Sequence, residues 1–208
     1  MSELVSVALG WARTLLNDDD ATNWTDPVLI PKLQVAHKEL QFALRNAGVP
    51  LMRAMSSPIS VLTGALTVTL PTDLVEPITL WEAAAATPLS GFVLMTEKDP
   101  LPLVAQAATL KYWQWYQETI TFVGATAGRY VMMKYKRSLT LPDAAGDSIG
   151  FINGENYLAP RTAALAALSN GNKDLHDVLT QTATATLSTI ILANRGRVPP
   201  SQGSAPRP

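Results

Sequence analysis

Residues 26–48 read DPVLIPKLQVAHKELQFALRNAG and contain the strongest helix signals in the chain. Asp26 suits the N-cap of a helix, Pro27 suits its first position, and Gly48 suits the stop at its far end. The residues predicted to share one face are apolar apart from a histidine: Ile30, Leu33, His37, Leu40, Leu44 and Ala47. The opposite face is charged: Lys32, Lys38, Glu39 and Arg45. This pattern predicts a long amphipathic helix that lies against a core.

A shorter helix is predicted before this stretch. Ser2 suits its N-cap, and the charged run Asn17–Asp20 ends it. Its apolar residues recur at helical spacing: Leu4, Ala8, Trp11 or Ala12, and Leu15.

Two more helices are predicted near the C-terminal end. The first has Pro160 in its first turn, places Leu158 and Leu168 on one face, and stops at Asn170-Gly171. Asn172 suits the cap of the second, which runs from Asp174 to about Arg195.

Between these helices the periodicity becomes that of strands. Residues 66–70 alternate leucine or valine with threonine, and 78–81 form a second short apolar run. A hairpin is predicted from the alternation at 119–122, through the turn at 124–128, to a returning strand at 130–136. Several strands separated by turns indicate a small antiparallel sheet or barrel-like module.

The predicted fold class is therefore α+β, a helical bundle built from both chain ends with an inserted small antiparallel β module. The bundle takes residues 1–50 and 143–197, and the β-rich insertion takes 51–142. Residues 198–208 are a proline-, serine- and glycine-containing tail with no packing pattern.

Composition restricts the functions open to the chain. Of its 208 residues 47% are hydrophobic, so it can bury a core, and its net charge of -1 gives no electrostatic reason to bind nucleic acid or a membrane surface. The absence of cysteine excludes disulfides, thiolate metal sites and cysteine nucleophiles. The apolar start at 4–11 follows no basic region and is far shorter than the ~20 residues of a membrane span. We therefore expect a soluble intracellular chain.

No residue pattern predicts catalysis or a bound ion. His37 and His176 have no partner at metal-ligand spacing, so one packed and one exposed histidine are expected. Asp18–Asp20 lacks the alternation and glycine of a calcium loop. The glycines at 146, 150 and 154 lie outside any strand-to-helix phosphate turn. The sequence thus predicts neither an enzyme nor a catalytic, metal or cofactor site.

The aromatic run Tyr112–Tyr116 is the most unusual local feature. Its side chains either fill the core of the β module or anchor an interface, and the same two roles are open to Trp81. The candidates for core or interface aromatics are Trp81, Trp113, Trp115 and Tyr116. Base stacking would need interleaved cations, and only Lys111 is near.

Several phrases resemble the head-to-tail adaptor, or connector, proteins of tailed bacteriophages. Residues 24–40 resemble the family's early helix, which runs into A-x-x-E-L, and 70–74 resemble its L-P-x-D strand exit. Residues 120–135 resemble its hairpin, and Phe151-Ile152 with 157–168 resemble its return to helix.

The resemblance implies a structural virion protein of the neck. Such adaptors form a homo-oligomeric ring, usually a dodecamer, between the portal and a tail or neck protein, in virions assembled in the host cytoplasm. DNA passes through the channel without sequence-specific binding, which suits a chain of net charge -1. C-terminal segments of the family reach the portal. The candidate portal-binding residues here are Arg195, Arg197, Val198, Pro199 and Pro200.

One alternative of another class stays open. A carbohydrate- or ligand-binding β module on a helical stalk would expose Trp81, Trp113 and Trp115 in a line. The adaptor interpretation buries most of them in a core or an interface.

Overall fold

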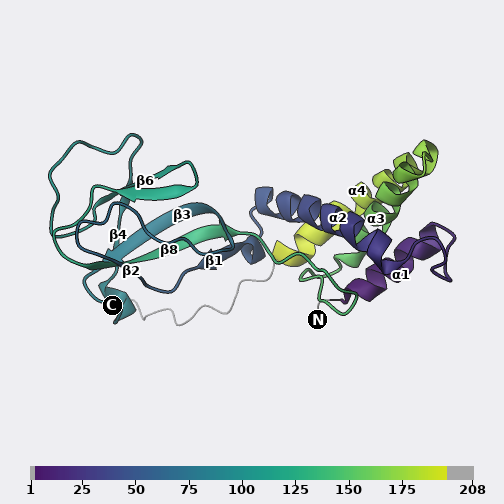
Figure 1. The fold of residues 1–208 in the computed structure, drawn as a ribbon, viewed down its shortest axis with the longest axis horizontal. Coiled ribbons are helices and arrows are strands. Elements are labelled where there is room, and N and C mark those ends of the chain that lie inside the picture. The colour runs from purple at the N-terminus through teal and green to yellow at the C-terminus, as the bar shows by residue number, and fades with distance from the viewer. Residues whose placement is uncertain (1–2, 196–208) are drawn as a thin grey trace. The chain divides into compact units, whose positions relative to one another are not determined.

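The computed structural model describes residues 3–195, and this chain divides into two compact units (Figure 1). The helical unit comprises residues 3–52 and 139–195, and the β unit comprises Arg53–Ser138. Helices come from both ends of the chain and strands from its middle, so the predicted α+β class is confirmed. The predicted tail at 198–208 lies outside the described residues.

The helical unit is built around one central helix. Its elements are α1 (Val5–Leu15), α2 (Asp26–Asn46), the 3₁₀ turn η1 (Pro50–Met52), α3 (Glu155–Ser169) and α4 (Lys173–Arg195). Helix α3 contacts α1, α2 and α4. Its small side chains let these helices approach closely, and many of them are fully buried: Ala159, Ala163, Ala164 and Ala166. Leu158 is buried but Leu168 is 49% exposed, so the prediction of one shared apolar face is wrong for this helix. A helix that is apolar all round is covered on several sides.

Helix α2 ends as the sequence predicts and begins one residue earlier than predicted. Gly48 adopts φ 68°, its N–H donates to Arg45 O, and Val49 N–H donates to Leu44 O. This pair of bonds closes the helix in the manner that glycine favours. At the other end Thr25 is the N-cap, and Asp26 is the first helical residue. The Asp26 carboxylate pairs with Arg13.

The connection between α3 and α4 follows the predicted stop and start. Gly171 adopts φ 76°, and Asn172 Oδ1 accepts the Leu175 N–H at 3.2 Å, so the predicted cap is confirmed. The start of α3 is a correction, because the helix begins at Glu155 and Pro160 lies in its second turn. Proline lacks the N–H that would bond Asn156 O. The Thr186 hydroxyl of α4 lies 3.3 Å from that carbonyl and 2.8 Å from Ala183 O of its own helix, and it can donate to either.

The β unit contains two sheets rather than one. The larger has strand order β1-β8-β3-β4 with β2 also paired to β8, all antiparallel, and Figure 1 shows β3 and β8 side by side. The smaller has the order β5-β6-β7, in which β5 runs parallel to β6. The strand bounds are β1 Arg53–Met55, β2 Ile59–Val61, β3 Leu74–Ala83, β4 Val93–Leu94, β5 Thr96–Glu97, β6 Tyr112–Tyr116, β7 Thr119–Phe122 and β8 Arg129–Arg137. A 3₁₀ turn, η2 (Leu89–Gly91), precedes β4.

The predicted hairpin between 119–122 and 130–136 is wrong. Strand β7 pairs with β6, whereas β8 belongs to the larger sheet. The physical reason is the two-residue turn Gln117-Glu118, whose φ angles of 47° and 55° match the twist of a tight hairpin. Glutamine and glutamate rarely adopt positive φ, so the sequence gives no turn signal there.

The predicted strand at 66–70 is also wrong. Thr67 forms one isolated bridge with Thr121, and Phe122 N–H donates to Leu66 O at 2.8 Å. Val68 is 9% exposed but Leu66 is 55% exposed, so the alternation does not bury one whole face. The predicted strand at 78–81 is confirmed as part of β3.

Candidate functional site

An apolar stripe runs along the solvent side of α2. Val28, Val35 and Phe42 recur every seven residues and are 39%, 46% and 62% exposed. Seven residues are almost two helical turns, so these side chains lie in line. The opposite side of the helix is fully buried at Leu29, Leu33, Leu40 and Leu44. Nothing in the described chain covers the stripe, and sequence periodicity singled out only the buried side.

Helix α1 has a second exposed apolar stripe. Of its predicted periodic residues only Ala8 and Ala12 are buried, and Val5 and Leu9 complete the buried side. The larger residues remain in solvent: Leu4 47%, Trp11 48% and Leu15 41% exposed. Helix α1 therefore docks on the unit through Val5, Ala8, Leu9 and Ala12, while Trp11 and Leu15 remain largely in solvent.

The outer face of α4 is uncharged over most of its length. Val178 and Leu192 are 59% and 66% exposed. Between them, Thr182 Oγ1 donates to Val178 O at 3.0 Å and Thr184 Oγ1 donates to Thr180 O at 2.8 Å. These hydroxyls bond the helix itself, and residues 178–194 contain no charged residue, so the outer face lacks the charges that solvated helix faces normally carry.

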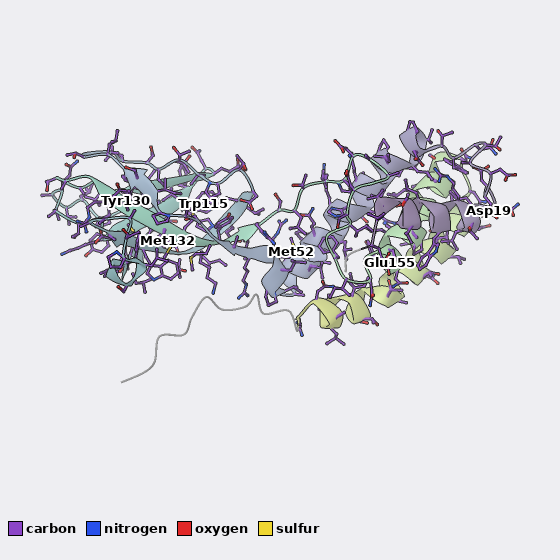
Figure 2. The ribbon with its side chains drawn as sticks, turned by 90° about the horizontal axis from the view of Figure 1, so that it is seen from below. Asp19, Met52, Trp115, Tyr130, Met132 and Glu155 are labelled. Atoms are coloured by element: carbon purple, nitrogen blue, oxygen red, sulfur yellow. The ribbon has the colours of Figure 1, made fainter. Side chains whose placement is uncertain are left out.

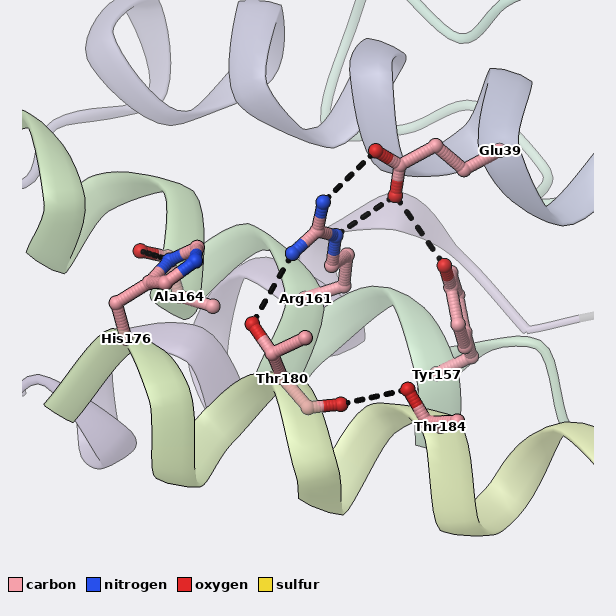
Figure 3. A network of polar contacts seen from close by, with 7 residues as sticks. All are labelled: Glu39, Tyr157, Arg161, Ala164, His176, Thr180 and Thr184. Atoms are coloured by element: carbon pink, nitrogen blue, oxygen red, sulfur yellow. Dashed lines mark hydrogen bonds and ion pairs between the residues drawn. The ribbon is translucent and has the colours of Figure 1, made fainter. Parts of the chain in front are cut away.

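A polar network around an ion pair connects α2 and α4, which carry two of these faces, through α3 (Figure 3). Arg161 of α3 binds Glu39 of α2 through two bonds, Nε to Oε2 at 2.7 Å and Nη2 to Oε1 at 2.8 Å. Arg161 Nη1 also donates to Thr180 of α4 at 3.1 Å, and the Tyr157 hydroxyl donates to Glu39 at 3.2 Å. Hydrogen bonds from Arg161 lower the pKa of Glu39 despite partial burial. Burial, followed by the charge of Glu39, raises the pKa of Tyr157 to about 12. The network holds α2, α3 and α4 in one arrangement.

The two histidines are structural. His37 is fully buried, with Nε2 3.0 Å from Ile149 O and Nδ1 3.0 Å from Gln41 Nε2. Since the amide nitrogen can only donate, Nδ1 accepts and Nε2 carries the proton. Burial lowers the pKa of His37, although its bond to the Ile149 carbonyl opposes this. His176, predicted to be exposed, is half-buried and bonds Ala164 O through Nδ1 at 3.0 Å (Figure 3).

The Asp18–Asp20 run is a turn former. Asp18 is 8% exposed, and its carboxylate accepts backbone N–H bonds from Thr22, Asn23 and Trp24, the last at 2.7 Å. Burial alone would raise the pKa of Asp18, but these donors outweigh it and the pKa is lowered. Across residues 3–195 no group of three or more histidine, aspartate or glutamate side chains is arranged to hold a metal ion.

The predicted aromatic residues lie in different environments. Trp113 is 2% exposed in the core of the β unit, where it faces Phe122 across the hairpin. Trp115 and Trp81 are half-buried, and Tyr116 is 59% exposed. Because Trp113 is buried, the three tryptophans do not form an exposed line. A carbohydrate- or ligand-binding β module was expected to expose them in a line, and this expectation is not met.

Trp81 belongs to an apolar row on one face of the larger sheet. Its register partners are Leu94 on β4, which is 60% exposed, and Met132 on β8, which is half-buried. Directly paired residues share a face, so these side chains form one row across three strands. Figure 2 shows Met132 and Tyr130 within this unit.

Of the predicted portal-binding residues, the structure describes only Arg195. Its exposed side chain donates from Nη2 to Ala47 O, the C-cap of α2, at 3.3 Å. It therefore ties the end of α4 to the end of α2, a contact that sequence spacing does not reveal. Arg197, Val198, Pro199 and Pro200 lie outside the described residues.

Two cavities of the β unit have few ionisable groups in their linings. One of ≈ 260 Å³ is lined by Val104, Lys111 and Tyr112 among others, and one of ≈ 440 Å³ by Met55, Ser56 and Tyr135. The Tyr135 hydroxyl donates to Asp73 at 2.8 Å, and burial with this bond raises its pKa to about 12. Neither lining brings together an acid, a base and a nucleophile.

Within the part of the chain that the structure describes, no helix has the length and apolar character needed to cross a membrane. Comparison with models of known families and with curated proteins finds no match.

Proposed function

We propose that this chain is a structural subunit that assembles with copies of itself into the head-to-tail adaptor ring of a tailed bacteriophage. In this role it lies in the neck of the virion, between the portal and a tail or neck protein. The observation that supports assembly most directly is the stripe Val28, Val35 and Phe42, three exposed apolar side chains that lie in line on one helix. Apolar faces that the chain leaves uncovered mark interaction surfaces.

The arrangement of the chain agrees with this role. The helical unit combines both ends of the described chain, and Arg161 joins three of its helices through its ion pair with Glu39 and its hydrogen bond to Thr180. A rigid unit with apolar faces on more than one helix can contact two neighbours at once, as each subunit of a ring must. The near-neutral net charge of -1 would let DNA pass without strong attraction.

The test is to measure the mass of the purified full chain alone and with the portal protein of the same virus. We expect a ring of many copies, seen as closed particles with a central hole by electron microscopy, either alone or on the portal. A chain that stays monomeric in both samples would contradict the proposal.

A truncation after Arg197 tests the contribution of the tail. We expect weaker portal docking with an unchanged melting temperature, because residues 198–208 carry no packing pattern. Unchanged docking would show that the portal contact lies elsewhere.

A further inference from the structure

The exposed stripes of α1 and α2 are bordered by charges of opposite sign. On α1 the basic residue Arg13 is used internally, because it donates to Trp24 O at 2.8 Å and pairs with Asp26. The acidic Asp19 is exposed, and Thr14 Oγ1 donates to its carboxylate at 2.7 Å. Thr14 lies three residues after Trp11 of the stripe, so the two occupy neighbouring positions on the surface of α1, and the Asp19 carboxylate is bound beside the stripe. Asp19 lies at one end of the helical unit (Figure 2).

On α2 the roles of the charges are reversed. Its acidic residues are used internally, Asp26 by Arg13 and Glu39 by Arg161. Lys38 is exposed, three residues after Val35 and four before Phe42, so it borders the stripe. Among residues 3–195 it has no hydrogen-bond or ion-pair partner.

We infer that the α1 face of one copy, formed by Leu4, Trp11, Leu15 and Asp19, docks on the α2 face of a second copy, formed by Val28, Val35, Phe42 and Lys38. This inference rests on the proposed function in one respect: it takes the partner to be another copy of the same chain. Burial of the two apolar stripes drives the contact, with Trp11 and Phe42 as its large anchoring side chains.

The charges decide which face meets which. A contact between two α1 faces brings together two acidic borders, and a contact between two α2 faces brings together two basic ones, so both are disfavoured relative to the unlike pair. Only the unlike combination sets Asp19 near Lys38. Each copy then offers one face to one neighbour and a different face to the next, and such a contact closes into a ring when the rotation between copies allows it.

The experiment uses charge reversal in the full chain. Lys38→Glu reverses the charge that borders the α2 face, and Asp19→Lys reverses the charge that borders the α1 face. Because both residues are exposed, the circular dichroism spectrum and the melting temperature of each variant should not change. We expect each variant alone to need an at least about tenfold higher concentration for half-assembly in mass photometry. A mixture of the two variants should assemble like the wild type, because each face with a reversed charge can bind a face of opposite charge on the other variant.

Lys111→Glu, a reversal at an exposed lysine of the β unit, is the matched control and should assemble normally. If the wild type assembles while either single variant does too, or while the mixture fails to recover, the inference is overturned and the proposed function stands. If the wild type is monomeric alone and with the portal protein, the proposed function itself fails.

Discussion

Gln41 of α2 and Leu139, 98 residues apart in sequence, exchange two hydrogen bonds of 2.9 Å each. The amide Nε2 donates to Leu139 O, and Leu139 N–H donates to Oε1. The chain re-enters the helical unit at Leu139, so one side chain satisfies the backbone of the returning segment and fixes it on α2.

Replacing this amide should destabilise the helical unit. Gln41→Leu leaves the Leu139 N–H and C=O and His37 Nδ1 without their partner, and we expect the free energy of unfolding to fall by about 2–3 kcal/mol. Urea unfolding followed by far-ultraviolet circular dichroism measures this loss. Gln181→Leu, at an exposed position of α4, is the control and should change the free energy by less than about 0.5 kcal/mol. Equal midpoints for the two variants would contradict the role of Gln41.

His37 should make folding stability depend on pH. Its pKa in the folded state is lowered below the usual 6.5, so the unfolded chain binds a proton that the folded chain does not. The neutral His37 therefore makes its full contribution to the free energy of unfolding above pH 6.5. This contribution is lost as the pH falls toward the folded-state pKa, at up to about 1.4 kcal/mol per pH unit.

The variant His37→Gln tests this assignment, because its amide can donate to Ile149 O and accept from Gln41 without titrating. We expect urea unfolding of the variant to be less sensitive between pH 7 and pH 5 than that of the wild type. An identical pH dependence would mean that another group titrates.

The ion pair between Arg161 and Glu39 should contribute measurably despite partial exposure. A double-mutant cycle with Arg161→Met and Glu39→Gln should give a coupling free energy of about 1 kcal/mol, since the pair is bidentate. The exposed pair Lys173 and Asp177 on α4 is the matched comparison, and it should give about 0.3–0.5 kcal/mol. Equal coupling in the two cycles would show that the second Arg161 bond adds nothing.

Two aromatic residues of β6 should respond differently to truncation. Trp113→Ala removes a fully buried side chain and should lower the free energy of unfolding by about 3–5 kcal/mol. Tyr116→Ala alters an exposed one and should change it by less than about 0.5 kcal/mol. Denaturant unfolding followed by tryptophan fluorescence compares them. A small effect at Trp113 would contradict its place in the core.

Local signals in the sequence were sufficient where a structure depends on neighbouring residues. The end of α2 at Gly48 and the start of α4 after Asn172 follow from conformational preferences and side-chain capping within a few residues. The buried side of α2 follows in the same way from its 3.6-residue period.

Contacts between distant segments needed the tertiary structure. The pairing of β7 with β6 depends on the Gln117-Glu118 turn, whose positive φ angles no residue type announces. The partner of Glu39 is Arg161, 122 residues away, and the sequence shows only two separate charges.

The exposed faces of α1 and α2 show most clearly which features follow from local sequence and which depend on contacts between distant segments. Local patterns in the sequence were enough to predict an α+β chain with helices from both ends, because periodicity and capping are local properties. The burial of Ala8 and Ala12 and the exposure of Trp11 follow from tertiary packing, as does the ion pair of Arg13 with Asp26, whereas Asp19 has no ion-pair partner among the described residues. Burial and charge pairing depend on what lies across the core, and a side chain's neighbours there come from segments that are far away along the chain.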